Sequence, residues 1–131
     1  MYLVEYIQSH QLIRANSLLS DLVENILING ITHNRSPKIE INIKISKKQQ
    51  DGNNYIKIEF IDNGVGIPDD QKKFIFEKKT DGYESGRGMG LGLSLVKKII
   101  DSYNGQIWVE DRVRGDYSKG SNFVLLIPEA E

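Results

Sequence analysis

The spacing of apolar residues predicts an amphipathic helix in the first third of the chain. It should begin after a cap at Asn16 or Ser17 and end near Asn34, because Pro37 disfavours its continuation. A second ridge along its side carries polar side chains, including Asn25 and Asn29. The apolar stripe consists of Leu18, Leu19, Leu22, Val23, Ile26, Leu27, Gly30 and Ile31.

Alternating apolar and polar positions on either side of this helix predict extended strands. Lys38–Ser46 alternates isoleucine with polar residues, and Tyr55–Asp62 repeats the pattern. Lys47–Asn54, which contains Asp51-Gly52, reads as a polar hairpin connection between the two strands. Tyr2–Arg14 reads as one or two strand-like stretches.

A short helix is predicted to begin at Pro68 and to carry Phe74, Ile75 and Phe76. Lys78–Ser85 shows no periodicity, which predicts a mobile loop that nucleotide phosphates would order. A further helix should start near Gly90. Its apolar stripe is Leu95, Val96, Ile99, Ile100 and Tyr103, and its stop signal is Asn104-Gly105.

Two strands complete the pattern, Gln106–Asp111 and Ser121–Ile127, with Arg112–Gly120 between them as a polar loop. Consecutive strands that pair as hairpins, with helices between them, predict an α+β fold. We expect a two-layer α/β sandwich in which three helices cover one face of a mixed, mostly antiparallel sheet of about five strands. The 131 residues form a single domain, 1–131.

Composition narrows the classes of function. The net charge of −1 gives no electrostatic reason to expect a nucleic-acid partner or an anionic membrane. The absence of cysteine excludes disulfides, thiolate metal sites and a cysteine nucleophile, and it fits a reducing compartment.

Two glycine-rich segments, Asp62–Ile67 and Gly86–Leu93, carry the candidate chemistry. Glycines let backbone amides approach an anion closely, and the second segment opens into a helix whose N-terminus favours phosphate. The carboxylate that opens the first segment, Asp62, can if buried accept a hydrogen bond from the exocyclic amine of adenine. Guanine presents a carbonyl at the same position of the ring. Alone, a strand followed by Asp-Asn-Gly is more typical of an ordinary turn.

These motifs, in this order from Asn25 to Ser121, resemble the ATP-binding catalytic domain of sensor histidine kinases. That domain belongs to the wider superfamily of DNA gyrase B, the Hsp90 chaperones and the MutL proteins, so the resemblance implies a Bergerat-type ATP-binding fold. It also implies ATP and Mg²⁺ as cofactors, with Asn29 as the Mg²⁺ ligand, Asn25 beside the phosphates and Asp62 as the adenine reader.

The resemblance extends the expected nucleotide site to both glycine-rich segments. His33 would hydrogen-bond phosphate or ribose, although a histidine at a helix end is as often structural. Ser121 would place a hydroxyl near the adenine carboxylate, and Phe76 belongs to an aromatic box. The full set of expected nucleotide-binding residues is Asn25, Asn29, His33, Asp62, Gly64, Gly66, Ile67, Phe76, Arg87, Gly88, Met89, Gly90, Leu91, Gly92, Leu93 and Ser121.

The chain departs from the family pattern at phosphate-facing positions. Thr32 stands where a lysine is common, and Lys79-Thr80-Asp81 replaces an aromatic residue followed by arginine. Lys78, Lys79 or Arg87 would then substitute, unless these charges are simply solvated.

Superfamily members that hydrolyse ATP carry a glutamate base at the position of Asn25, and Glu24 points about 100° away around the helix. This favours phosphoryl transfer over hydrolysis. Neither His10 nor His33 has the setting of a phosphoacceptor.

We therefore expect the catalytic domain of a two-component sensor histidine kinase. It would transfer the γ-phosphoryl group to a histidine on a separate helical hairpin and, indirectly, serve a response regulator. The isolated domain should be monomeric and cytoplasmic, either free or as the cytoplasmic part of a membrane-bound sensor. A stand-alone anti-sigma-type serine kinase and a non-catalytic adenine-nucleotide-binding module are the alternatives.

Overall fold

The computed structural model describes residues 2–6, 18–77 and 89–129 of the chain. Within them the chain forms five strands, two α-helices and one 3-10 helix, η1. In chain order these are β1 (Tyr2–Tyr6), α1 (Leu18–Thr32), β2 (Ile41–Gln50), β3 (Asn53–Asp62), η1 (Asp69–Gln71), α2 (Met89–Ser102), β4 (Gln106–Val113) and β5 (Asp116–Pro128).

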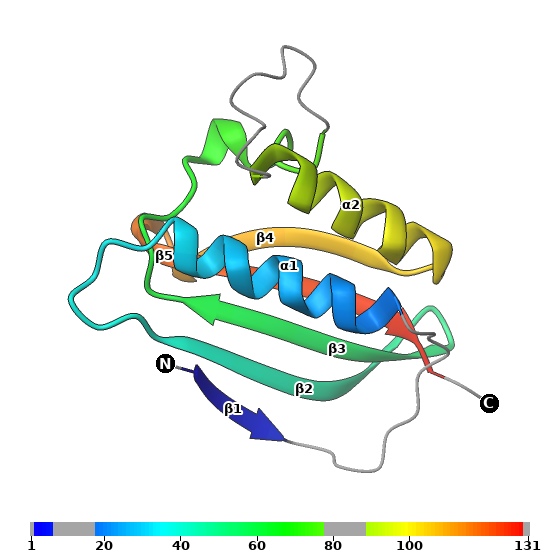
Figure 1. Ribbon diagram of the computed structural model, residues 1–131. Coiled ribbons are helices and arrows are strands. Elements are labelled where there is room, and N and C mark those ends of the chain that lie inside the picture. The colour runs from blue at the N-terminus through cyan, green and yellow to red at the C-terminus, as the bar shows by residue number, and fades with distance from the viewer. Residues whose placement is uncertain (1, 7–17, 78–88, 130–131) are drawn as a thin grey trace.

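The strands form one mixed sheet in the order β1-β2-β3-β5-β4. β1 runs parallel to β2, and the other neighbouring pairs are antiparallel. α1 and α2 lie side by side across one face of this sheet (Figure 1). The two-layer α+β sandwich is therefore confirmed, with two α-helices and a 3-10 turn in place of three helices.

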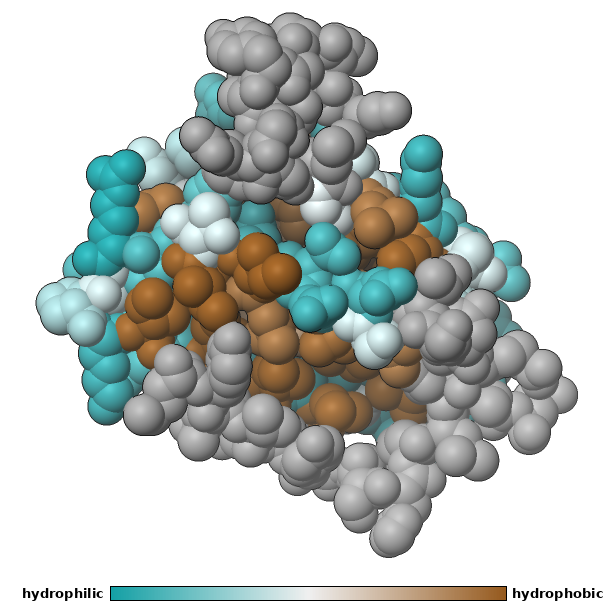
Figure 2. All heavy atoms as spheres, in the orientation of Figure 1, coloured by the Kyte–Doolittle hydropathy of each residue, from teal (hydrophilic) through white to brown (hydrophobic). Residues whose placement is uncertain are grey.

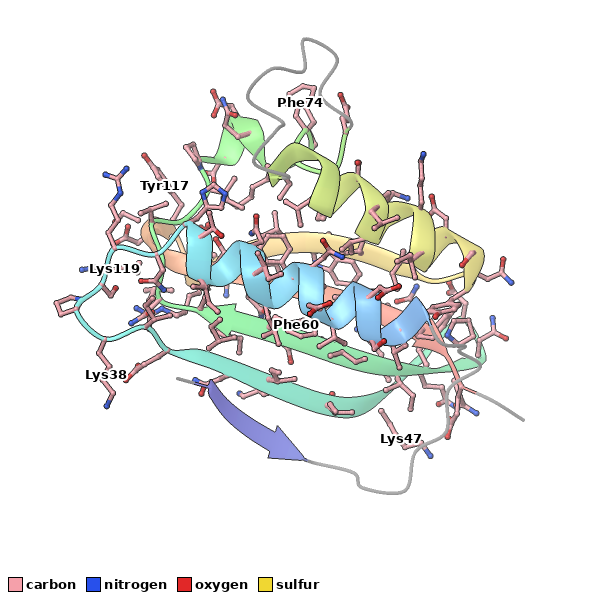
Figure 3. The ribbon with its side chains drawn as sticks, viewed as in Figure 1. Lys38, Lys47, Phe60, Phe74, Tyr117 and Lys119 are labelled. Atoms are coloured by element: carbon pink, nitrogen blue, oxygen red, sulfur yellow. The ribbon has the colours of Figure 1, made fainter. Side chains whose placement is uncertain are left out.

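The core lies between the helices and the sheet. Phe60 on β3 lies beneath α1 (Figure 3) and is 2% exposed. Alternate residues of β5 face the same layer, as the pattern Phe123, Leu125 and Ile127 predicts. Apolar side chains also reach the surface on the face that carries α1 (Figure 2), where Ile28 is exposed. Neither described helix combines the length and apolar character needed to cross a membrane.

The hairpins are longer than predicted. β2 and β3 pair as far as Gln50 and Asn53, so the connection is only Asp51-Gly52. Both of these residues have positive φ, 52° and 80°, as in a type I′ hairpin turn. The prediction of a polar loop at Arg112–Gly120 is wrong. β4 ends only at Val113 and β5 already begins at Asp116, so a two-residue turn joins them.

The segment around the aromatic residues also differs from the prediction. Only Asp69–Gln71 is helical, as the 3-10 helix η1, and the two phenylalanines follow in successive turns. Phe74 is 51% exposed and points away from the sheet (Figure 3). Within α2, Leu95 does not belong to the buried stripe, since it is 44% exposed. α2 ends as predicted, at an Asn104 with φ 62°.

Several predictions fall on residues outside the described part of the chain. They are the helix cap at Asn16 or Ser17, the continuation of the first strand-like stretch to Arg14, the mobile loop Lys78–Ser85, and the roles of Arg87 and Gly88.

Candidate functional site

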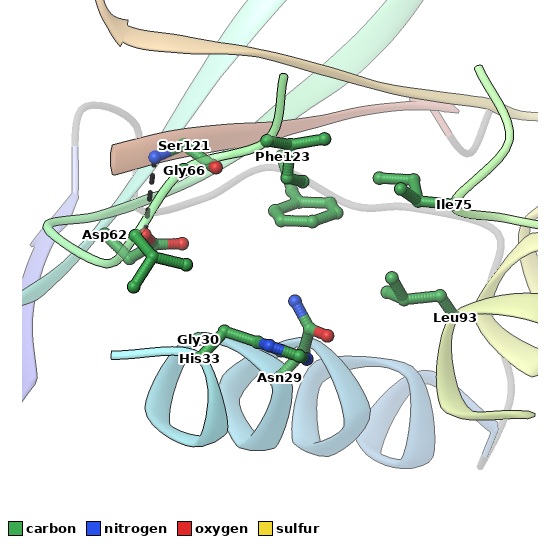
Figure 4. A pocket seen from close by; sticks show the side chains of 11 residues that line it. Asn29, Gly30, His33, Asp62, Gly66, Ile75, Leu93, Ser121 and Phe123 are labelled. Carbon is green, nitrogen blue, oxygen red and sulfur yellow. Dashed lines mark hydrogen bonds between the residues drawn. The ribbon is translucent and has the colours of Figure 1, made fainter. Parts of the chain in front are cut away.

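A pocket of about 130 Å³ lies at the end of the sheet where β3 stops and β5 begins, between the C-terminal turn of α1 and the N-terminal part of α2 (Figure 4). Its wall is mostly apolar, with a few polar side chains. It is lined by Asn29, Gly30, His33, Asp62, Val65, Gly66, Ile67, Ile75, Leu93, Ser121 and Phe123.

Asp62 is the buried charge of this pocket, with an exposure of 7%. Its Oδ1 accepts hydrogen bonds from the backbone amides of Gly64, at 2.9 Å, and Ser121, at 3.3 Å. Its Oδ2 lies toward α1 at Gly30, where an added Cβ would be 3.7 Å away. The two amides therefore fix the carboxylate and leave its second oxygen toward the pocket.

Burial raises the pKa of Asp62, and the hydrogen bonds from Gly64 and Ser121 oppose that shift. His33, on the opposite wall, has a lowered pKa because of burial, although the charge of Asp62 acts in the other direction. The imidazole is therefore neutral at physiological pH and presents one donor and one acceptor.

Two close backbone contacts shape the pocket and require glycine. Gly66 has φ 78°, and a Cβ there would lie 1.7 Å from the carbonyl oxygen of Tyr117. Gly120 has φ 118°, and a Cβ there would lie 2.0 Å from the carbonyl oxygen of Asp62. These contacts bring the loop after β3 and the start of β5 together around the carboxylate.

The end of α1 is fastened to the loop after β3. The carbonyl of His33 accepts a hydrogen bond from the amide of Val65 at 3.0 Å. The side-chain oxygen of Asn63 accepts a hydrogen bond from the side-chain nitrogen of Asn34 at 2.8 Å, and its side-chain nitrogen donates to the carbonyl of Lys38 at 3.0 Å. These bonds hold α1 and the carboxylate in a fixed relation. β2 begins after this anchor, at Ile41 rather than at the predicted Lys38.

Asn25 lies on the α1–α2 contact and not in the pocket wall. Its side-chain nitrogen donates to the carbonyl of Asp21 at 2.7 Å, and its Oδ1 would be 3.1 Å from a Cβ on Gly92. Gly64 and Phe76 also lie outside the lining. Phe76 supports it, since its ring meets that of Phe123 edge-on at 6.1 Å.

The structure brings seven of the predicted residues together in the lining: Asn29, His33, Asp62, Gly66, Ile67, Leu93 and Ser121. Ser121 reaches Asp62 through its backbone amide rather than through the predicted hydroxyl. Met89, Gly90 and Leu91 form the first turn of α2.

Sequence reasoning missed four lining residues: Gly30, Val65, Ile75 and Phe123. Three of them adjoin predicted residues, and a glycine next to Asn29 on a helix was a usable signal. Phe123 had none, because its place in an alternating strand predicts only a core residue.

A comparison with known families matches residues 15–131 to the family described as histidine kinase-, DNA gyrase B-, and HSP90-like ATPase. The matched region begins before α1 and includes both glycine-rich segments and the whole pocket.

Curated relatives include signalling kinases. The chain is 32% identical over 117 residues to the adaptive-response sensory kinase SasA of Gloeothece citriformis, covering 85% of this chain and 27% of that protein. It is 29% identical over 114 residues to the autoinducer 2 sensor kinase/phosphatase LuxQ of Vibrio vulnificus, covering 84% and 13%. The chain thus spans about a quarter or less of the length of these relatives.

Solved structures share the fold. The nucleotide-free catalytic domain of the histidine kinase ThkA superposes with a TM-score of 0.77 at 25% identity, covering 98% of this chain and 78% of that one. A full-length ShkA structure, in complex with AMPPNP, superposes with a TM-score of 0.70 at 22% identity, covering 98% and 26%. The chain belongs to the histidine kinase-, DNA gyrase B- and HSP90-like ATPase family.

Proposed function

We propose that this domain binds ATP in the pocket around Asp62 and acts as the catalytic domain of a sensor histidine kinase. The observation that carries the proposal is the carboxylate itself. Oδ1 is held by two backbone amides, and Oδ2 lies toward a mostly apolar pocket. An acceptor fixed in this way suits the exocyclic amine of adenine and opposes the carbonyl of guanine.

The apolar wall suits the flat faces of a purine. Val65, Ile67 and Ile75 line the pocket together with Leu93 and Phe123. The first turn of α2, Met89–Leu91, has backbone amides without helical partners, and such amides favour phosphate. The base would lie against Asp62 and the phosphates near α2, with neutral His33 in reach as a further hydrogen-bonding group.

The residues present also suit Mg²⁺ bound mainly through phosphate. Asn29 contributes a hard amide oxygen to the pocket. Within the described residues, no group of three or more His, Cys, Asp or Glu side chains could hold a metal ion. Mg²⁺ would therefore use Asn29, nucleotide oxygens and water, and when bound it would neutralise charge on the phosphates.

The pocket favours transfer over hydrolysis. Its titratable lining residues are Asp62 and His33. Oδ1 of Asp62 is engaged with two amides, and Oδ2 would be occupied by the adenine amine in the proposed complex. Glu24 is exposed on the outer side of α1. With adenine bound to Asp62, the described part of the pocket lining would offer no further carboxylate to activate water. The domain's residues would instead bind and orient ATP for a histidine on a separate helical hairpin domain. A response regulator as indirect partner, the cytoplasmic location and the monomeric state of the domain stay predictions.

A transfer assay tests this proposal. The domain, Mg²⁺ and labelled ATP are mixed with His-bearing hairpin domains of sensor kinases, and label on the hairpin is compared with free phosphate. We expect acid-labile label on histidine and little phosphate release. Asn29→Ala should lose most Mg²⁺-dependent binding and transfer, while Glu24→Gln on the outer face of α1 should change neither. Rapid phosphate release without a hairpin, or label on serine, would contradict the kinase assignment.

A further inference from the structure

Lys72 occupies an unusual position for a lysine. It directly follows η1, in the segment that runs from Ile67 to Ile75, and both of these residues line the pocket. Its side chain is only 19% exposed, which is low for a lysine outside an interface. The neighbouring Lys73, in contrast, is exposed and lies 5.3 Å from the ring of Phe74.

The ammonium group of Lys72 joins its own segment to strand β4. Nζ donates to the carbonyl oxygen of Ile67 at 2.8 Å and to Asp69 Oδ1 at 2.5 Å. It also forms an ion pair with Asp111 Oδ1 on β4 at 2.8 Å. The first two contacts are hydrogen bonds within the segment, and the ion pair with Asp111 is the contact that reaches another strand. The ring of Tyr117, at the same end of the sheet (Figure 3), lies 5.9 Å away.

The ion pair reaches the pocket carboxylate through the sheet. Asp111, whose side chain is 14% exposed, is the register partner of Ser121 across β4 and β5. The amide of Ser121 donates to Asp62. Lys72 therefore connects the wall segment that contains Ile67 to the strand pair that holds the carboxylate.

The other attachments of the wall segment in the described part of the chain are apolar, since Ile67, Ile75 and Phe76 pack against the core. Its backbone hydrogen bonds are local, such as those from the Gln71 amide to the Pro68 carbonyl and from the Phe74 amide to the Gln71 carbonyl. The contact of Phe76 with Phe123 is apolar and does not fix a direction for the loop. The charged contacts of Lys72, above all its ion pair with Asp111, supply that direction.

We propose that Lys72 is a positioning residue, whose ammonium group ties the wall segment 67–75 to β4 and thereby sets the spacing between Ile67 and the Asp62 carboxylate. This inference rests on the proposed function only in naming ATP as the ligand of the pocket. Partial burial lowers the pKa of Lys72, but hydrogen bonds to Asp111 and Asp69 outweigh that effect and raise it. The ammonium group is therefore charged at physiological pH.

Four variants of the domain separate positioning from simple stability. Lys72→Met keeps an unbranched stem and removes the charge, and Lys72→Arg keeps the charge. Lys72→Met/Asp111→Asn also removes the buried carboxylate that the first variant leaves without its partner. Lys73→Met is the matched control at the adjacent position. Amide hydrogen exchange of the nucleotide-free protein and calorimetric titration with ATP and Mg²⁺ are measured for each.

We expect faster exchange at the amides of Gln71 and Phe74 and about tenfold weaker ATP binding in Lys72→Met. The double variant should show the same two changes, whereas Lys72→Arg and Lys73→Met should resemble the parent. Restoration of both readouts in the double variant would overturn the inference, because the effect would then come from the unpaired Asp111. Unchanged exchange and affinity in Lys72→Met would also overturn it. A parent protein that binds no ATP would instead contradict the proposed function, and the exchange data would still test the role of Lys72.

Discussion

At the scale of single residues, Asp62 combines a binding role with an energetic cost. It is 7% exposed, and within the described chain the hydrogen bonds to it come from two backbone amides. Burial raises its pKa, so the charged form is harder to accommodate in the folded domain than in the unfolded chain. The burial of this carboxylate is better explained by a role in binding a ligand than by a contribution to folding stability.

Asp62→Asn should therefore stabilise the nucleotide-free domain while weakening ATP binding. A raised pKa in the folded state means that the contribution of Asp62 to stability is full below its ordinary pKa of 3.8 and is lost as the pH rises through the folded value. At neutral pH the variant should be more stable than the parent by about 0.5–2 kcal/mol. It should also lose about 1–3 kcal/mol of ATP binding, since its amide would present a donor to the adenine amine.

Urea unfolding of both proteins across the acid range measures the stability difference. The difference should shrink toward zero as the pH falls below the ordinary pKa of aspartate. Asp70→Asn, which changes an exposed carboxylate in η1, is the control and should show no such trend. A variant that is less stable than the parent at neutral pH would show that the charge of Asp62 stabilises the fold.

At the scale of elements, the β4–β5 hairpin contains strand residues that hydrophobic periodicity does not predict. Residues 112–119 are mostly polar and exposed, apart from the half-buried Asp116, so neither face carries an apolar row that could indicate a strand. The strands nevertheless continue, and Val113 pairs with Asp116. The extension places Tyr117 against Gly66 and Gly120 against Asp62, so it forms part of the pocket.

Two glycines of this hairpin provide a matched test. Gly115 and Gly120 both have positive φ, but an added Cβ meets nothing within 4 Å at Gly115 and overlaps the carbonyl of Asp62 at Gly120. We expect Gly115→Ala to cost about 1–2 kcal/mol of stability from backbone strain alone. Gly120→Ala should cost at least about 3 kcal/mol and weaken ATP binding, because β5 must move away from Asp62. Equal losses of stability in thermal unfolding, with ATP binding intact, would mean that the contact at Gly120 is unimportant.

At the scale of the whole molecule, the sequence predicted those helices and strands that bury one face and expose the other. The stripe of α1 and the alternation in β2, β3 and β5 predicted the sheet and the helix layer, because a single core imposes both periods. The motif around Asp62 predicted the main polar group of the pocket only together with Asn29 and the second glycine-rich segment, because an Asp-Asn-Gly sequence alone is typical of ordinary turns.

The remaining features depend on contacts between distant segments. Leu95 has the spacing of a core residue, yet it is exposed, whereas its neighbour Val96 is buried. Phe123 becomes a pocket residue only because β5 lies next to β3. In the sequence Lys72 is one charge in a polar segment, and its ion pair with the distant Asp111 forms only in the folded protein. Local patterns carry no information on such pairs.

Calorimetric titration of the domain with ATP and with GTP, each with Mg²⁺, tests the central claim most directly. If Asp62 reads the exocyclic amine of adenine, ATP should bind at least about tenfold more tightly than GTP, a difference of about 1.4 kcal/mol. That preference should disappear in Asp62→Asn. Equal affinities of the parent domain for ATP and GTP would contradict the assignment of this pocket as an adenine site.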